Sequence, residues 1–180
     1  MQHVSIDDEA TAESPRRISL SEALGYAHEH NVVHRDIKPG NVMYEPDSGT
    51  LKITDFGIAR ITDSSKTKTG MVLGTPSYMS PEQIAGKKVE GYSDLFSLGV
   101  MFYQMLTAKL PFSADSMATL MYRIANEAHT PVQELRSDLP KCTTRIIDRA
   151  LNKDPEARYS DGHEMARAIR ECARMLEQAE

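Results

Sequence analysis

The sequence has few of the residues that mark several special classes of protein. Its 180 residues include two cysteines, ten glycines and nine prolines. So few glycines and prolines exclude a collagen-like or low-complexity chain. Two cysteines are too few to suggest a disulfide framework, and Cys142 and Cys172 do not have the spacing of metal ligands. We therefore expect each cysteine to pack as a small apolar side chain.

The sequence also has no long apolar run and no excess of positive charge. Its longest nearly apolar stretch, Leu95 to Leu106, is too short to cross a bilayer, and residues 1–14 are polar and acidic, unlike a signal peptide. The net charge of -5 argues against a non-specific nucleic-acid binder. We expect a cytoplasmic protein with no nucleic-acid partner and no membrane segment in this chain, and leave its oligomeric state open.

What is present is the composition of one globular domain, with 40% hydrophobic and 26% charged residues. Residues 1–15 show no periodicity and are predicted to form a flexible leader. Residues 16–30 carry apolar side chains at helical spacing. The short runs 42–44 and 51–53 flank a turn and predict a β-hairpin.

The second half of the chain is predicted to be helical. Residues 55–82 form a long segment rich in Thr, Ser, Lys and Gly, and segments of that length are usually functional or mobile. The helices expected after it are 93–107 with Ser93 as its N-cap, 117–126, 143–151 and a last helix opened by Ser160. The predicted fold is mainly α with a small β-hairpin, in one domain over residues 16–180.

Two loops beside the predicted hairpin carry residues suited to phosphoryl transfer. Residues 34–41 (His-Arg-Asp-Ile-Lys-Pro-Gly-Asn) precede the hairpin, and residues 55–57 (Asp-Phe-Gly) follow it. Together they offer two carboxylates, an amide and an ammonium group. Such a set can orient a hydroxyl nucleophile, supply oxygen ligands for Mg²⁺ and neutralise the charge of a transferring phosphate.

The order of these motifs resembles the catalytic and metal-binding loops of eukaryotic-type protein kinases, and bacterial Ser/Thr kinases in style. Residues 74–82 (Gly-Thr-Pro-Ser-Tyr-Met-Ser-Pro-Glu) resemble the loop that reads the substrate, with Ser80 in place of the usual Ala. Residues 93–99 resemble the start of a buried central helix, and residues 154–159 the turn before the last helix. The resemblance implies a protein-kinase-like C-terminal lobe.

The resemblance implies a role in catalysis for five residues. Asp36 would accept or orient the proton of the substrate hydroxyl, and Lys38 would contact the γ-phosphate of ATP. Asn41 and Asp55 would bind Mg²⁺. Met43 would form the floor under the adenine ring. The cofactors implied are thus ATP and Mg²⁺, and the partners are protein substrates with Ser or Thr acceptors.

The resemblance also implies structural roles for five further residues. His34 and Phe56 would belong to an internal hydrophobic spine. Asp94 would anchor the backbone of residues 34–41, called the catalytic loop below. Glu82 and Arg158 would make a buried ion pair that fixes the substrate-reading loop to the helical body.

The resemblance also implies regulation by phosphorylation. Arg35 and Arg60 would form a basic pocket for a phosphate on the segment 55–82, because two arginines can order a loop around a dianion. Thr67 and Thr69 are the expected phosphoacceptors, ahead of Ser64 and Ser65. The residues expected to read the substrate are Gly74, Thr75 and Pro76.

The motifs of the N-terminal lobe of the family do not occur in this sequence. It contains no Gly-x-Gly-x-x-Gly, and residues 1–15 contain no glycine or lysine. We expect a truncated chain with little activity alone, and an exposed apolar face where the N-terminal lobe would pack. Two hypotheses follow: a Ser/Thr kinase represented here by part of its domain, or a non-catalytic kinase remnant that acts as a protein-binding scaffold.

Overall fold

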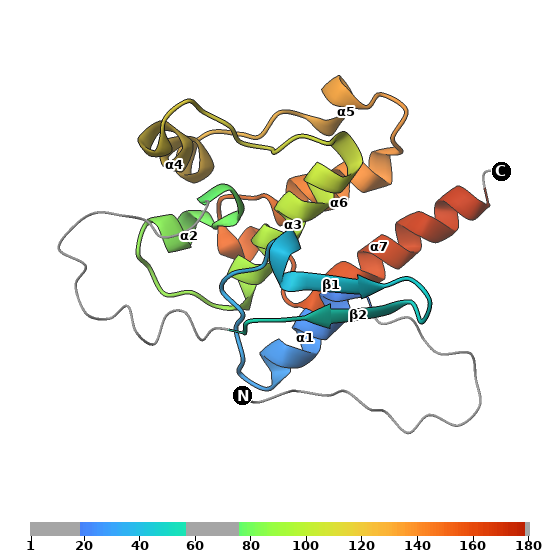
Figure 1. Ribbon diagram of the computed structural model, residues 1–180. Coiled ribbons are helices and arrows are strands. Elements are labelled where there is room, and N and C mark those ends of the chain that lie inside the picture. Colours follow the sequence, from blue (N-terminus) through green and yellow to red (C-terminus); the bar gives the residue numbers. More distant parts are fainter. Residues whose placement is uncertain (1–18, 57–75, 179–180) are drawn as a thin grey trace.

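The computed structural model describes residues 19–56 and 76–178 (Figure 1). Several predicted features lie outside these residues: the leader at 1–15, Arg60, the phosphoacceptors Thr67 and Thr69, and Gly74 and Thr75 of the substrate-reading loop.

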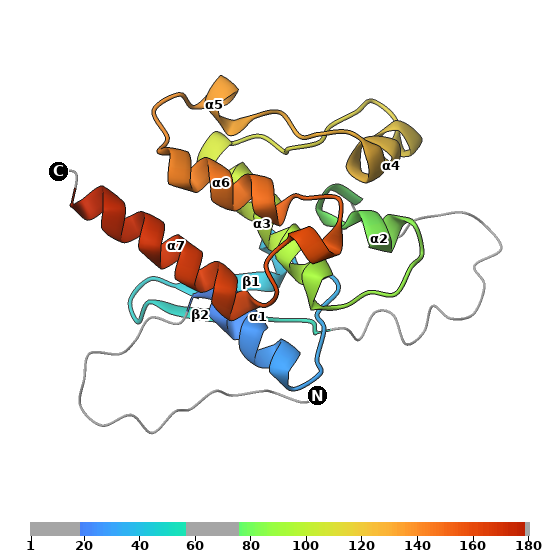
Figure 2. The same ribbon diagram turned by 180° about the vertical axis from the view of Figure 1, so that it is seen from behind.

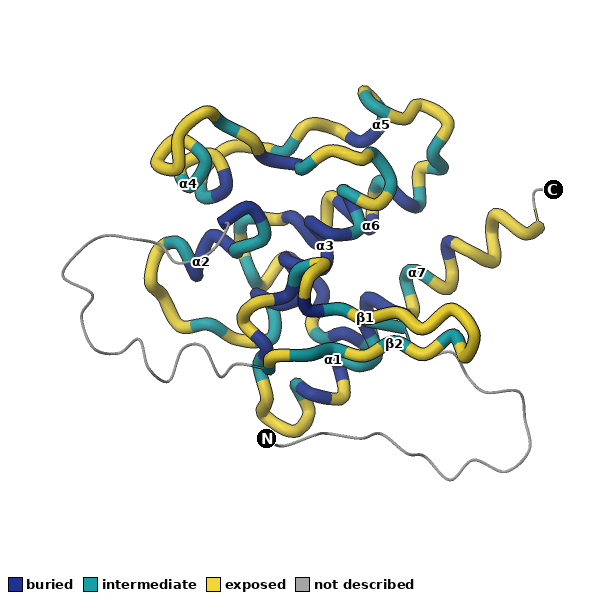
Figure 3. Tube along the Cα trace, viewed as in Figure 1, coloured by how far each residue is buried: buried dark blue, intermediate teal, exposed yellow. Residues whose placement is uncertain are grey.

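The body of the fold is built around one buried helix, α3 (Gly91–Thr107). Nearly every residue from Ser93 to Tyr103 is buried, and α3 packs against α6 (Lys141–Ala150) and α1 (Leu20–Glu29). The last helix, α7 (Gly162–Glu177), lies along both α6 and α1. Figure 2 shows α6 and α7 together on the side of α3 away from the strands. Figure 3 shows that burial is concentrated in α3 and the helices around it.

The predicted β-hairpin is confirmed. Strand β1 (Val42–Glu45) pairs antiparallel with β2 (Thr50–Ile53), so that Val42 faces Ile53 and Glu45 faces Thr50. Gly49 closes the turn with a φ of 67°, which glycine adopts at little cost. The described residues are therefore mainly helical with one small hairpin, as the sequence predicted.

The structure shows which residues begin and cap three of the predicted helices, and two of these caps differ from the prediction. α1 begins after its N-cap Ser19, whose hydroxyl and the Glu22 side chain form a reciprocal capping box. α3 begins two residues before the predicted Ser93, which is a buried residue inside the helix; the prediction of Ser93 as N-cap is wrong. The last helix is capped by Asp161 rather than Ser160.

Shorter elements complete the fold. α4 (Met117–Asn126) has its predicted bounds, and α6 begins two residues before the predicted start at residue 143. The remaining elements are the helices α2 (Pro81–Ile84) and α5 (Val132–Leu135) and the 3₁₀ turns η1 (Pro39–Asn41), η3 (Pro76–Tyr78) and η4 (Pro155–Ala157).

The prediction for the cysteines is wrong. Cys142 of α6 and Cys172 of α7 form a disulfide across 30 residues of sequence, with their Cα atoms 5.6 Å apart. Counting cysteines could not reveal this pair, because what matters is that α6 and α7 pack side by side. The disulfide therefore ties the last helix to the helical body.

No helix among residues 19–56 and 76–178 has both the length and the apolar character that a membrane span requires.

Candidate active site

The loop between α1 and β1 gathers three of the predicted catalytic residues around one carboxylate. The Lys38 ammonium lies 2.7 Å from Asp36 Oδ2. The Asn41 amide donates to the same oxygen at 3.0 Å and to the Asp36 backbone carbonyl at 2.7 Å. The side chains of Asp36 and Lys38 are 49% and 36% exposed, so both remain within reach of a substrate.

The residue before Asp36, Arg35, has an unusual backbone conformation that Asp94 of α3 stabilises. Arg35 has a φ of 69°, in the left-handed region that costs a non-glycine residue about 1 kcal/mol or more. The buried carboxylate of Asp94 in α3 accepts the backbone N–H groups of His34 at 2.8 Å and Arg35 at 2.7 Å. Asp94 thus ties the backbone of residues 34 and 35 to α3.

His34 joins the catalytic loop to the second loop, which follows β2. Its Nδ1 accepts the N–H of Asp36 at 3.2 Å, which leaves Nε2 to donate to the carbonyl of Thr54 at 2.8 Å. The ring also meets Phe56 edge-on, with 4.8 Å between centroids. These contacts bring the segment that contains Asp55 against the catalytic loop.

The side chains next to this junction have the chemistry of a Mg²⁺ site. The Asn41 amide nitrogen is used in both bonds to Asp36, so its oxygen is the atom left for a cation. Asp55 follows Thr54, whose N–H donates to the Asn41 carbonyl at 2.9 Å. Asp55 has a φ of 58°. A carboxylate and an amide oxygen are hard ligands that fit Mg²⁺. Asn41 and Asp55 would hold such an ion.

Met43, the residue predicted to lie under the adenine ring, is on β1 and is 60% exposed. A shallow apolar pocket lies beside the same strand, lined by Pro39, Val42, Met101, Gln104 and Met105. Met105 and Tyr44 are also largely exposed. The hairpin and the end of α3 therefore present apolar surface beside the catalytic loop.

Glu82 and Arg158 form a two-pronged ion pair in the interior, with distances of 2.8 and 2.9 Å. The remaining Arg158 donors are taken by three backbone carbonyls, those of Tyr92, Asn152 and Lys153. Burial by itself raises the pKa of Glu82. Hydrogen bonds from Arg158 and Ser93, together with the charge of Arg158, outweigh burial and hold that pKa below its ordinary value. Both charges are therefore fully satisfied.

Two polar residues at the site, the partly buried His28 and the buried Gln83, were missed by the sequence analysis. His28 of α1 shares Asp94 through a 2.9 Å contact between Nε2 and Oδ2. Gln83 of α2 contacts both Ser80 and the backbone of Arg35. A signal for Gln83 was present, because Ser80 followed three residues later by Gln is a capping-box pattern. No comparable local signal marks His28.

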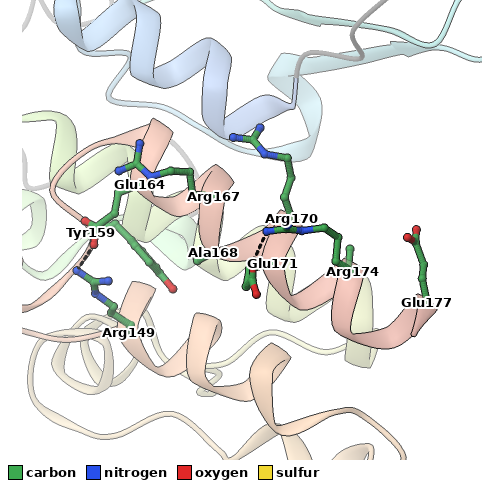
Figure 4. A pocket seen from close by; sticks show the side chains of 10 residues that line it. Arg149, Tyr159, Glu164, Arg167, Ala168, Arg170, Glu171, Arg174 and Glu177 are labelled. Atoms are coloured by element: carbon green, nitrogen blue, oxygen red, sulfur yellow. Dashed lines mark hydrogen bonds and ion pairs between the residues drawn. The ribbon is translucent and has the colours of Figure 1, made fainter. Parts of the chain in front are cut away.

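A larger hollow lies elsewhere, along α7 (Figure 4). It is lined by four arginines and three glutamates, and most of these charges are paired. Arg149 lies 2.7 Å from Glu164, Arg170 pairs with Glu22 of α1, and Arg174 pairs with Glu171. This hollow contains none of the predicted catalytic residues, which lie on the hairpin and in the loops beside it. It is therefore a surface feature separate from the candidate site.

Comparison with known proteins gives a consistent result. A sequence profile described as the protein kinase domain matches residues 3–173. The chain is 46% identical over 147 residues to the serine/threonine-protein kinase drp72 of Corynebacterium efficiens, covering 81% of this chain and 28% of that protein. It is 42% identical over 148 residues to PknA of Mycobacterium tuberculosis, also a serine/threonine-protein kinase, covering 82% of this chain and 33% of PknA.

PknB of Mycolicibacterium smegmatis, another serine/threonine-protein kinase, is 38% identical over 147 residues, covering 80% of this chain and 23% of that protein. The chain thus spans between about a quarter and a third of the length of these curated relatives. All three are bacterial proteins, in agreement with the style of the motifs. The profile match extends over nearly all of the sequence, and the chain therefore belongs to the protein kinase domain family.

Proposed function

We propose that residues 16–180 are the C-terminal lobe of a Ser/Thr protein kinase, which transfers the γ-phosphate of ATP to Ser and Thr hydroxyls of protein substrates. The observation that carries this proposal is the cluster at Asp36, whose carboxylate is shared by Lys38 and Asn41 and remains half exposed. A scaffold would have no chemical use for an accessible carboxylate held in this way.

The chain's residues would divide the work as follows. The Asn41 amide donates to Asp36 Oδ2 and to the Asp36 backbone carbonyl, so the other carboxylate oxygen, Oδ1, can receive the hydroxyl proton of the acceptor. Lys38 would turn from Asp36 to the γ-phosphate and balance its charge as the phosphoryl group moves. Mg²⁺ bound at Asn41 and Asp55 would neutralise phosphate charge. Met43 would support the adenine ring.

Regulation is proposed on the segment that follows Asp55. A phosphate on Thr67 or Thr69 would be received by Arg35 and Arg60, and charge-assisted hydrogen bonds would order the substrate-reading loop. Arg35 is the member of this group that the structure describes, and its backbone is fixed by Asp94.

The proposal is tested in a chimaera. The groups that hold the α- and β-phosphates in this family, a glycine-rich loop and a strand lysine, are not found among residues 19–56 and 76–178, so we expect the isolated chain to have little activity. The aligned part of M. tuberculosis PknA is therefore replaced by that of this chain. We expect Mg·ATP-dependent phosphorylation of a protein substrate. Asp36→Asn should reduce the rate by at least about a thousandfold without lowering the melting temperature.

A folded chimaera that transfers no phosphate would contradict the proposal and favour the protein-binding scaffold instead. Equal activity of the chimaera and its Asp36→Asn variant would also contradict it, since the activity would then not come from this site.

A further inference from the structure

Gln83 makes two hydrogen bonds that connect separate parts of the site. It lies in the short helix α2, directly after Glu82, and is 6% exposed. Its Oε1 accepts the backbone N–H of Ser80 at 2.9 Å, and its Nε2 donates to the backbone carbonyl of Arg35 at 2.8 Å. One side chain therefore joins the end of the substrate-reading loop to the residue before Asp36.

This geometry requires an amide. The group at Ser80 is a donor and the group at Arg35 is an acceptor, and both are backbone groups whose polarity cannot change. A glutamate could accept from Ser80 but, when ionised, could not donate to Arg35. The same two partners also fix which end of the Gln83 amide carries the oxygen.

Gln83 completes a clamp on Arg35. The N–H of Arg35 is bound by the Asp94 carboxylate from α3 at 2.7 Å, and its carbonyl is bound by Gln83 from α2 at 2.8 Å. The two elements hold Arg35 at its positive φ of 69°. Because the carbonyl of Arg35 and the N–H of Asp36 belong to one planar peptide, the clamp also fixes the direction in which Asp36 leaves the backbone.

The segment around Ser80, which the Gln83 side chain contacts at its oxygen, is itself held firmly in the fold. Ser80 is fully buried and caps α2, with its hydroxyl accepting the N–H of Gln83 at 3.3 Å. Glu82, the neighbour of Gln83, is fixed to Arg158 in the interior. α2 is therefore held in place independently of the Gln83 side chain, and that side chain links the position of Ser80, at the end of the substrate-reading loop, to Arg35.

We propose that Gln83 is a positioning residue, which orients Asp36 through the Arg35 carbonyl and couples the placement of the substrate-reading loop to the catalytic loop. This inference rests on the proposed phosphoryl transfer at Asp36. It assigns no contact between Gln83 and substrate. Its effect is to hold the catalytic carboxylate in the geometry that in-line transfer needs.

The test uses two substitutions and a matched control. Gln83→Glu keeps the shape and the acceptor for Ser80 but removes the donor to Arg35, and Gln83→Met removes both hydrogen bonds at similar length. Gln133→Glu makes the same charge change in α5, where Gln133 contacts Thr144 of α6.

The first readout needs no activity. In ¹⁵N-labelled chain we expect the amide resonance of Asp36 to move in both Gln83 variants and to stay in place in Gln133→Glu. Amide exchange of Arg35 should accelerate by about tenfold or more, while exchange in α6 and α7 is unchanged. If Gln83→Glu does not fold, Gln83→Met carries the same comparison. Unmoved Asp36 and Arg35 signals in a folded Gln83 variant would overturn the proposal.

The second readout is kinetic and uses the PknA chimaera. Gln83→Glu should lower kcat for phosphoryl transfer about tenfold and leave KM for ATP unchanged, because the positioning matters in the transition state and not in nucleotide binding. An equal loss in Gln133→Glu would assign the effect to charge or stability and overturn the positioning role. An inactive wild-type chimaera would count against the proposed function alone, since the Asp36 resonance tests the clamp by itself.

Discussion

Arg158 is the largest fully buried side chain of the described residues, and its charge has one partner, Glu82. Arg158→Met would leave the Glu82 carboxylate buried without its cation. We expect the free energy of unfolding to fall by about 3–5 kcal/mol, measured by urea denaturation. Arg167→Met, at an exposed position of α7, should change it by no more than about 0.5 kcal/mol. Similar values for the two variants would show that the ion pair contributes little.

At the residue scale, the sequence predicted a side-chain pair that family motifs specify but missed a pair that depends on how the helices pack. Glu82 and Arg158 lie 76 residues apart, and only the resemblance to the kinase family made their pairing predictable. The contact of His28 with Asp94 spans 66 residues and belongs to no such prediction. A buried polar partner is chosen by the packing of α1 against α3, which local sequence does not encode.

The elements themselves were predicted best where a local pattern decides them. The bounds of α4 and the β-hairpin follow from apolar periodicity and turn residues. The start of α7 did not, because two adjacent residues, Ser160 and Asp161, are both good N-caps. The close contact of α7 with α1 could not be predicted from the sequence either. A Cβ on Gly162 would come within 2.0 Å of the Ser21 carbonyl, so only glycine allows this crossing.

The disulfide between α6 and α7 gives a prediction at the same scale. It closes a loop across 30 residues, and the entropy that this removes from the unfolded chain corresponds to about 3–4 kcal/mol of stability. Adding a dithiol reductant should therefore lower the urea midpoint of the wild-type chain.

The control for this prediction is Cys142→Ser, which should resemble the reduced wild type and show no response to reductant. A wild-type midpoint that is the same with and without reductant would contradict a stabilising role for this bond.

Considered as a whole, the molecule owes part of its stability to carboxylates whose protonation changes on folding. Among the partly buried carboxylates of the described residues, four have pKa values held below their ordinary range: Glu22, Glu82, Asp161 and Glu164. Burial raises the pKa in each case. It is outweighed by hydrogen bonds from backbone or Ser and Arg partners and by a nearby Arg or His charge. These four groups lie in α1, α2 and at the start of α7, so their effect is spread over the fold.

The direction of the pH dependence follows from these lowered values. Between the native and the ordinary pKa of such a group, the unfolded chain binds more protons than the folded one, so stability falls as the pH falls. The contribution is complete above about pH 5 and is lost as the pH drops through the native pKa values. We expect the free energy of unfolding, measured by urea denaturation from pH 7 to pH 3, to decrease steadily below pH 5.

Glu82→Gln separates the interior ion pair from the other three groups. The variant is less stable at pH 7, because a neutral amide replaces the partner of buried Arg158. Its stability should nevertheless fall less between pH 5 and pH 3, since one titrating group has been removed. The matched control is Glu177→Gln, which makes the same substitution at an exposed position at the end of α7. Parallel curves for wild type and Glu82→Gln would mean that the Glu82 carboxylate gains nothing from its ionised form in the folded state.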